Sequence, residues 1–276
     1  MPLRKLFLIL VIFSATVRAA DEPAPREWTI DGVKREALVY APPAAHDQPS
    51  PVIFAFHGHG GTMQIVARKW KYETLWPQAI VVYPQGLNTP GRLTDKEGKF
   101  PGWQAAPGEQ DDRDLKFFDR ILASLKKDYR VDESRIYVTG HSNGGTFVYV
   151  LWAARNDVFA AFAPASSSLS LTNVTVEKNA AEQKSWAPKP VLHIAGENDP
   201  LVKFQWQKLT IDTLRRINQC TDGQPWERNC TLYPSKIGAP VVALIHPGMH
   251  ALPNSALPVI VKFFKEHPKP STRSAK

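Results

Sequence analysis

The chain has 276 residues, of which 43% are hydrophobic and 22% are charged, and this is the ordinary composition of a folded globular protein. Its 34 lysines and arginines exceed its 26 acidic residues, so the formal net charge is +8. The basic residues form no dense stripe, which argues against a nucleic-acid-binding protein. The length suits one large α/β domain.

The first nineteen residues have the pattern of a secretory signal peptide. Arg4 and Lys5 precede an apolar stretch at residues 6–15, and Ala19 provides a small residue at a cleavage site. The apolar stretch is too short to span a bilayer core as an anchor. We therefore expect cleavage of residues 1–19, a secreted or periplasmic protein, and no membrane span in the mature chain.

The rest of the chain alternates strand-like and helix-like segments. A hairpin is predicted over residues 28–42 with its turn at Asp31-Gly32, followed by apolar strand patterns at 51–58, 79–86, 134–140, 190–200 and 240–248. Apolar residues at helical spacing are found over 112–129, 143–155, 203–218 and 254–267. This alternation predicts an α/β fold, a mostly parallel central sheet with helices on both faces. We expect a single domain over residues 20–267, a long surface loop at 87–111, and a flexible tail at 268–276.

One glycine-rich turn is the strongest candidate for a reactive site. A strand pattern runs into Gly140-His141-Ser142-Asn143-Gly144, and a helix pattern follows at once. In such a G-x-S-x-G turn, the glycines allow close backbone approach while one serine projects from a strained elbow. The following helix directs its N-terminal amides at the same place, which favours negative charge. We therefore predict that Ser142 is a nucleophile, and the alternative is a serine that only caps a helix.

A serine hydroxyl becomes nucleophilic when a base takes its proton and an acid orients that base. His250 lies in the loop after the last strand pattern and is the predicted base, with His246 as the alternative. Asp199 directly follows the preceding strand pattern and is the predicted acid, with Glu197 of the same loop as the alternative. The chain order Ser142, Asp199, His250 is the order typical of α/β hydrolases.

The motif HGHGG at residues 57–61 ends the first buried strand pattern. In an α/β hydrolase, one donor to the developing oxyanion is the amide of the residue after the nucleophile, here Asn143. The other donor comes from the loop after the first buried strand, and we assign it to the amide of His59, with Gly60 as the alternative. Each such donor stabilises the transition state by roughly 3 kcal/mol.

Other histidines receive structural interpretations, and no metal site is predicted. His193 lies inside a strand pattern and is interpreted as buried and hydrogen-bonded. His57 and His59 form an H-x-H pair, but no carboxylate or cysteine lies nearby in the sequence to complete a zinc site. His246 and His250 are four residues apart, but the intervening Pro-Gly pair forbids the helix that would bring them to one face.

Three tryptophans are candidates for substrate contact. Trp103 lies in the 87–111 loop and could stack on a sugar or aromatic ring. Trp186 and Trp206 flank the segment that carries the predicted acid and could line the cleft.

The two cysteines, Cys220 and Cys230, both follow the signal peptide. An even cysteine count in an exported chain favours a disulfide between them. Closing this short loop would contribute roughly 3 kcal/mol on the chain-entropy model.

Four stretches together resemble a known family. They are HGHGG, DDRDLKFFDRILASLKKDYRVDESRIYVTGHSNGG, PVLHIAGENDP and GMH, and they are similar to secreted polyhydroxybutyrate depolymerases and the related feruloyl and acetylxylan esterases. The resemblance extends over roughly residues 30–265. It implies an α/β-hydrolase fold and hydrolysis of carboxylic esters without a metal or organic cofactor. It places Ser142, Asp199 and His250 on the triad positions and His59 in the oxyanion loop, and it implies a Cys220–Cys230 disulfide. One departure lies after His250, where the family commonly has Trp-Pro and this chain has Ala-Leu-Pro.

The sequence therefore predicts a secreted, monomeric serine esterase without a cofactor. Its expected partner is an ester substrate, either a feruloyl or acetyl ester of plant polysaccharide or a polyhydroxyalkanoate-type polyester, and not nucleic acid. One alternative is a serine peptidase on the same fold, which usually carries an extra domain that gates its site. The other alternative is a non-catalytic binding module, which would be indicated by loss of a triad residue.

Overall fold

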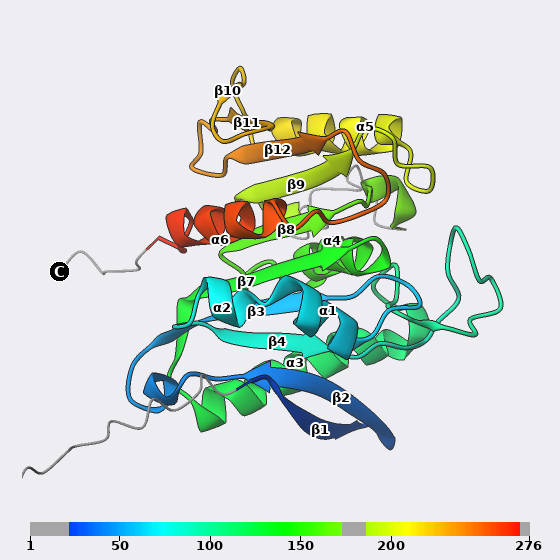
Figure 1. Cartoon of the computed structure of the whole chain (residues 1–276), viewed down its shortest axis with the longest axis vertical. Coiled ribbons are helices and arrows are strands. Elements are labelled where there is room, and N and C mark those ends of the chain that lie inside the picture. The colour runs from blue at the N-terminus through cyan, green and yellow to red at the C-terminus, as the bar shows by residue number, and fades with distance from the viewer. Residues whose placement is uncertain (1–21, 173–185, 271–276) are drawn as a thin grey trace, which may run out of the picture.

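The computed structural model describes residues 22–172 and 186–270, and the predicted signal peptide at 1–19 lies outside these ranges. A 10-stranded sheet runs through the whole molecule in the order β1-β2-β4-β3-β7-β8-β9-β12-β11-β10 (Figure 1). The strands are β1 Ala24–Ile30, β2 Val33–Tyr40, β3 Ser50–Phe56, β4 Ile80–Pro84, β7 Val131–His141, β8 Ala161–Ala165, β9 Val191–Gly196, β10 Gln224–Pro225, β11 Cys230–Tyr233 and β12 Val241–His246. Two short strands, β5 Leu87–Asn88 and β6 Pro101–Gly102, form a separate antiparallel pair.

The centre of the sheet is parallel, as the sequence predicts. Strands β4, β3, β7, β8, β9 and β12 all run in one direction. All seven residues of β3 are buried, which is expected of a strand covered on both faces. The predicted hairpin at Asp31-Gly32 is confirmed: β1 and β2 form the antiparallel pair at one edge, and β11 and β10 form the other edge.

Helices cover both faces of the sheet (Figure 1). They are α1 Met63–Trp70, α2 Tyr72–Leu75, α3 Arg113–Asp128, α4 Asn143–Arg155, α5 Phe204–Ile217 and α6 Ala256–Glu266, with 3₁₀ turns at Pro43–His46, Glu109–Asp112 and Leu169–Leu171. Side chains of α3, α4 and α5 belong to the apolar cluster on one face, and those of α1 and α6 belong to the cluster on the other. None of the helices in the described part of the chain is long and apolar enough to cross a membrane.

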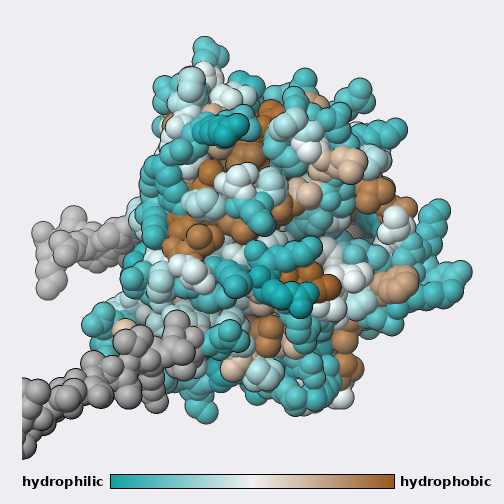
Figure 2. Space-filling model, in the orientation of Figure 1, coloured by the Kyte–Doolittle hydropathy of each residue, from teal (hydrophilic) through white to brown (hydrophobic). Residues whose placement is uncertain are grey.

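The two kinds of covering helix differ in how deeply they are buried. In α3, the apolar side chains at spacings of three and four are buried, as predicted, and the polar side chains other than Asp114 are partly or fully exposed. In α4, ten consecutive residues from Gly144 to Ala153 are buried, so this helix is enclosed on all sides. The outer face over α1 and α6 is mostly hydrophilic, and apolar residues gather around α6 (Figure 2). The helix that follows Ser142 is therefore held firmly within the core.

Two segments at the periphery of the described chain have structure that the sequence patterns do not specify. The 87–111 stretch is a loop, but it contains the β5–β6 pair, and it projects beyond the end of the sheet at which the parallel strands finish (Figure 1). The described start of the predicted flexible tail is fixed to the domain. The backbone N–H of Lys269 donates to the carbonyl of Ser134 at 2.8 Å, and its ammonium donates to the carbonyl of Asp157 at 2.7 Å.

The predicted disulfide between Cys220 and Cys230 is also corrected, because both residues are free cysteines. Cys220 packs against the apolar cluster on the α3–α5 face of the sheet. Cys230 is buried in the cluster on the opposite face, where α6 lies. The sheet itself therefore separates the two thiols.

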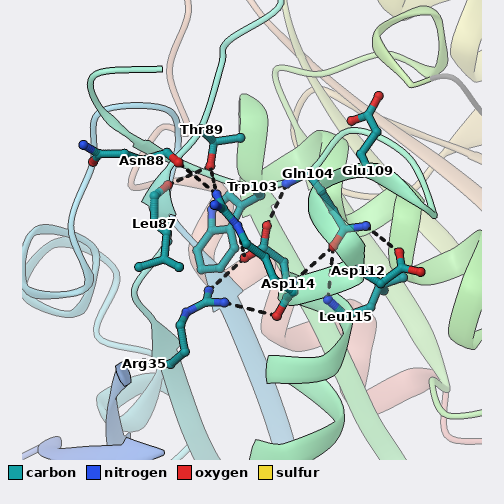
Figure 3. A network of polar contacts seen from close by, with 12 residues as sticks. Arg35, Leu87, Asn88, Thr89, Trp103, Gln104, Glu109, Asp112, Asp114 and Leu115 are labelled. Atoms are coloured by element: carbon teal, nitrogen blue, oxygen red, sulfur yellow. Dashed lines mark hydrogen bonds and ion pairs between the residues drawn. The ribbon is translucent and has the colours of Figure 1, made fainter. Parts of the chain in front are cut away.

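A buried ion pair joins the N-terminus of α3 to strand β2, and the same carboxylate also holds the loop that precedes the helix (Figure 3). The guanidinium of Arg35 contacts the Asp114 carboxylate at 2.8 Å, and the two side chains are 1% and 0% exposed. The other carboxylate oxygen accepts the backbone N–H of Gln104 at 2.8 Å. The Gln104 side chain in return accepts the amides of Asp114 and Leu115 at 3.1 and 3.3 Å, so it caps the helix. This network fixes the residue that follows Trp103.

We predict that Asp114→Ala lowers the free energy of unfolding by about 3–5 kcal/mol, because it leaves the Arg35 charge buried without its partner. Denaturant titration measures this change. The matched control is Lys116→Ala, which removes a solvent-exposed ion pair with Asp31 from the same helix. Equal losses of stability in the two variants would contradict the structural role given to the buried pair.

Candidate active site

Ser142 lies in a sharp turn between β7 and α4. Its backbone is left-handed, with φ of 57° and ψ of −120°, an uncommon conformation for a residue with a side chain. A Cβ atom on Gly140 would lie 2.5 Å from the carbonyl oxygen of Gly144, and one on Gly144 would lie 2.3 Å from that of Phe56. Neither position has room for a side chain. This close backbone approach is what the glycines on both sides of the serine predict.

The structure brings Ser142, His250 and Asp199 into one hydrogen-bonded row. The His250 Nε2 atom lies 2.7 Å from the Ser142 Oγ atom, and its Nδ1 atom lies 2.8 Å from the Asp199 Oδ2 atom. The second oxygen of this fully buried carboxylate accepts the amides of Leu201 and Val202, each at 2.9 Å. An ionised Asp199 accepts the Nδ1 proton, so the Nε2 lone pair faces the serine hydroxyl and can accept its proton.

The alternative residues for base and acid lie outside this row. The Nδ1 atom of His246 accepts the amide of Gly248 at 3.1 Å, and it supports the loop that carries His250. Glu197 is exposed to solvent. The geometry therefore favours the pair that the sequence placed first.

Two further histidines border the site and are neutral. The ring of His141 packs 4.8 Å from that of His250, and burial lowers the pKa of His141 to about 3. Burial also lowers the pKa of His57 to about 4. The His57 Nε2 atom accepts the amide of Gly86 at 2.9 Å, so its proton is on Nδ1, where it donates to the carbonyl of Gly58 at 2.7 Å. No positive charge on these rings opposes protonation of His250.

Two backbone amides beside Ser142 are available to a ligand. Within the described residues, the N–H groups of His59 and Asn143 have no hydrogen-bond acceptor. The amide of Gly60, the alternative considered from the sequence, donates to the carbonyl of Pro101 at 2.7 Å and is already used. The arrangement can therefore present two donors to an oxygen that gains negative charge.

Trp103 does not line the cleft, contrary to the expectation from its sequence position. Its side chain is 1% exposed and stacks on Phe147 with ring centroids 5.5 Å apart. Its indole N–H donates to the carbonyl of His57 at 2.8 Å. Its backbone exchanges two hydrogen bonds with the Asn143 side chain, at 2.7 and 3.0 Å. Trp103 therefore links the two loops that supply the free amides.

The other two tryptophans are also placed differently from the expectation. Trp186 is 6% exposed and packs against Trp152 with ring centroids 5.5 Å apart, so it belongs to the core. Trp206 is half-buried on α5, and it is absent from the lining of the cavity beside Ser142.

A cavity opens beside Ser142, and most of its wall was not predicted residue by residue. The loop at 87–111 contributes Pro90 to Thr94 and Ala105 to this wall. The remaining wall is formed by His59, Asn143, Thr146, Leu171, Leu201 and Val202. Single apolar residues in loops carry no sequence pattern, so they could not be identified in advance. The side-chain pair His59–Asp95, 2.9 Å apart, holds the loop to the oxyanion side of the cavity.

Within the part of the chain that the structure describes, no three histidine, cysteine or acidic side chains are grouped to hold a metal ion. The two histidines of the H-x-H pair have other partners, since His57 bonds to backbone groups and His59 bonds to Asp95.

Comparison with known proteins identifies the family of this chain. Residues 30–210 match the model of the Esterase family, described as "Putative esterase". The chain belongs to the Esterase family. It is 30% identical over 176 residues to a bifunctional acetylxylan esterase/xylanase of Neocallimastix patriciarum, an alignment that covers 63% of this chain and 23% of the relative. It is 29% identical over 188 residues to feruloyl esterase C of Emericella nidulans, covering 64% of this chain and 60% of that protein.

This Esterase-family chain thus spans between about a quarter and three fifths of the length of these two relatives. Solved structures share its fold at low sequence identity. The acetyl xylan esterase from Aspergillus awamori superimposes with a TM-score of 0.67 at 14% identity, covering 88% of this chain and 99% of that one. A ferulic acid esterase from Anaeromyces mucronatus gives 0.59 at 14% identity, covering 89% and 90%. The α/β-hydrolase fold expected from the sequence is confirmed.

We predict that Gly144→Ala slows covalent labelling of Ser142 by a serine-directed phosphonate by about 100-fold or more. The added methyl group would push the start of α4 away from β3, and a displacement of about 1 Å at a reacting atom has a cost of this size. Labelling rates followed by mass spectrometry provide the measurement.

The control for this change is Gly238→Ala. Gly238 has a positive φ, of 76°, which Gly144 does not have, and no heavy atom lies within 4 Å of an added Cβ. This variant should lose some stability and keep its labelling rate. Normal labelling of Gly144→Ala would show that the close packing of the elbow is not needed for reactivity.

Proposed function

We propose that the protein is a secreted carboxylic ester hydrolase that acts through an acyl-Ser142 intermediate. The observation that carries this proposal is the unbroken row from the Asp199 carboxylate through His250 to the Ser142 hydroxyl, at 2.8 and 2.7 Å, beside two free amides. Membership of the Esterase family supports the reaction class. The signal-peptide pattern at residues 1–19 supports secretion.

The reaction follows from the protonation states in the row. His250 takes the proton from Ser142 as the serine oxygen attacks the acyl carbon, and Asp199 stabilises the resulting imidazolium. The amides of His59 and Asn143 receive the negative oxygen of the tetrahedral intermediate. His250 then gives its proton to the departing alcohol, and the acyl group remains on the serine. A water molecule, activated by the same imidazole, releases the acid and restores the enzyme.

We propose that the substrate is a feruloyl or acetyl ester of plant polysaccharide. The names of the relatives, which include acetylxylan esterase and feruloyl esterases, support this class. The cavity wall formed by Leu93, Leu171 and Leu201 lies next to Ser142 and suits an apolar acyl group. A hydroxyalkanoate polyester is the second candidate, favoured by the sequence resemblance to polyhydroxybutyrate depolymerases.

Ser142→Ala should reduce kcat for p-nitrophenyl acetate by on the order of 10⁶, and Asp199→Asn by about 10⁴. Circular dichroism of both variants should match the unchanged protein, because neither substitution alters side-chain volume much. Glu197→Gln is the matched control for the acid, since this exposed carboxylate lies two residues away in the same loop. If Glu197→Gln were the crippling change instead, the assignment of the acid would be wrong.

A substrate panel tests the class of ester. With methyl ferulate, acetylated xylan and hydroxybutyrate oligomers compared by kcat/KM, we expect the plant-wall esters to be hydrolysed fastest. Fastest turnover of the hydroxybutyrate oligomers would replace this substrate assignment with the polyester. Preference for amide over ester substrates would make the protein a peptidase, and labelling of Ser142 without hydrolysis of any ester would make it a binding module.

A further inference from the structure

A row of buried polar side chains leads from Asp199 away from the cavity and into the core. It consists of Gln207 on α5, His193 in the middle of β9, and Tyr149 on α4, and each of these three residues is 0% exposed. Burial of so many polar groups is costly unless they are bonded to one another. Neither the fold nor the reaction described above accounts for them.

The amide group of Gln207 has a defined orientation. Its Nε2 atom lies 2.7 Å from the carbonyl oxygen of Val202 and 3.3 Å from the Oδ2 atom of Asp199. Both neighbours are acceptors, so the donating nitrogen must face them. The Gln207 Oε1 atom therefore points the other way. It is buried there, and among the described residues no donor lies in bonding geometry with it.

His193 is the neighbouring side chain that can supply a donor to this oxygen. Its Nδ1 atom lies 2.7 Å from the Tyr149 hydroxyl, and its buried Nε2 atom has no partner in bonding geometry among the described residues. Burial raises the pKa of Tyr149 well above its ordinary value, so the hydroxyl keeps its proton and can donate it to Nδ1. Burial lowers the pKa of His193 to about 4, and a hydrogen bond with Gln207 opposes that shift. The ring is thus neutral, and when the tyrosine donates to Nδ1 its one proton is on Nε2, where it can be donated to Gln207.

We propose that Tyr149, His193 and Gln207 form a relay of positioning residues that fixes a hydrogen-bond donor on the Asp199 carboxylate. Each member donates in the same direction, from the tyrosine hydroxyl to the imidazole, from the imidazole to the amide oxygen, and from the amide nitrogen to Oδ2. The Oδ2 atom that receives this donor is the one that accepts the Nδ1 proton of His250. The relay therefore sets how strongly the carboxylate attracts that proton. This inference rests on the proposed role of Asp199.

Loss of the relay should make His250 easier to protonate. A donor on Oδ2 withdraws negative charge from the oxygen that stabilises the imidazolium, so its removal strengthens the hold on the proton. Other titratable groups around the ring are His141, which contacts it, and Lys69, whose charge acts on His141. His246 and Glu197 interact with each other on the side of Asp199. None of these groups changes in the variants below.

The test compares Gln207→Met and Tyr149→Phe with Tyr83→Phe. The first two variants remove a link of the relay with little change in volume. Tyr83 is the matched control because its hydroxyl is likewise hydrogen-bonded in the core, to Glu73 at 2.6 Å and from the Tyr72 amide at 2.9 Å. It lies on β4, away from Asp199. Thermal unfolding of all three variants measures the purely structural cost.

We expect the acidic limb of the kcat/KM profile to move to higher pH by about 0.5 to 1 unit in Gln207→Met, and by less in Tyr149→Phe. The value of kcat should fall several-fold with KM unchanged, and Tyr83→Phe should keep the unchanged profile. A shift in Gln207→Met alone would overturn the relay, because Gln207 would then act by itself. Profiles that match the control in all variants would overturn the whole proposal.

Nuclear magnetic resonance of ring-labelled histidine separates this inference from the proposed function. The titration of the His250 ring in the three variants requires no substrate, and it should show the same order of shifts. If Ser142→Ala kept full ester hydrolysis, the proposed function would fail while this comparison would still decide the relay. An unmoved His250 titration in Gln207→Met would overturn the relay even if the protein hydrolyses esters.

Discussion

The site depends on the contact between the backbone of Gly144 and the carbonyl oxygens at the end of β3. A Cβ atom at this position would lie 2.3 Å from the oxygen of Phe56 and 2.5 Å from that of His57. This packing sets the distance between the start of α4 and the loop that carries His59. It also holds Ser142 at a positive φ, a conformation that persists only where surrounding structure enforces it. The deep burial of α4 provides that enforcement.

The loop at 87–111 is connected to the same elbow through Trp103. This residue bonds to the carbonyl of His57 on one side and to the Asn143 side chain on the other. Its neighbour Gln104 caps α3 and contacts the buried carboxylate of Asp114. The wall of the cavity and the two free amides therefore share one anchor, which extends to the ion pair at the base of α3. Changes in the tip of the loop can alter substrate choice while this anchor keeps the reacting groups in place.

The sequence alone predicts those parts of the structure that depend on a local pattern, such as the period of apolar residues or the position of glycines. The apolar runs predicted the parallel strands, and the spacing around Ser142 predicted the elbow. Strand β8, AFAPA, was missed because alanine and Pro164 have low strand propensity, and it is a strand because β7 and β9 pair with it on both sides. The prediction of a disulfide was wrong because an even number of cysteines does not reveal that Cys220 and Cys230 lie on opposite faces of a sheet. Trp103 shows the same limit, since an aromatic residue in a loop can equally serve the core.

The electrostatic arrangement explains why the hydrogen-bonded row of Ser142, His250 and Asp199 is already formed in the protein without a substrate. A buried carboxylate is stable only when donors satisfy its oxygens, and Asp199 receives two amides from its own loop, one from Gln207, and the imidazole. The neighbouring rings of His57 and His141 remain neutral because burial lowers their pKa values, so neither places a second positive charge beside the Asp199 carboxylate. Charge that develops during the proposed acyl transfer would then meet fixed dipoles and need no rearrangement of the protein. The groups that are preorganised in this way lie in the core. The loops that form the cavity wall can therefore differ without disturbing them.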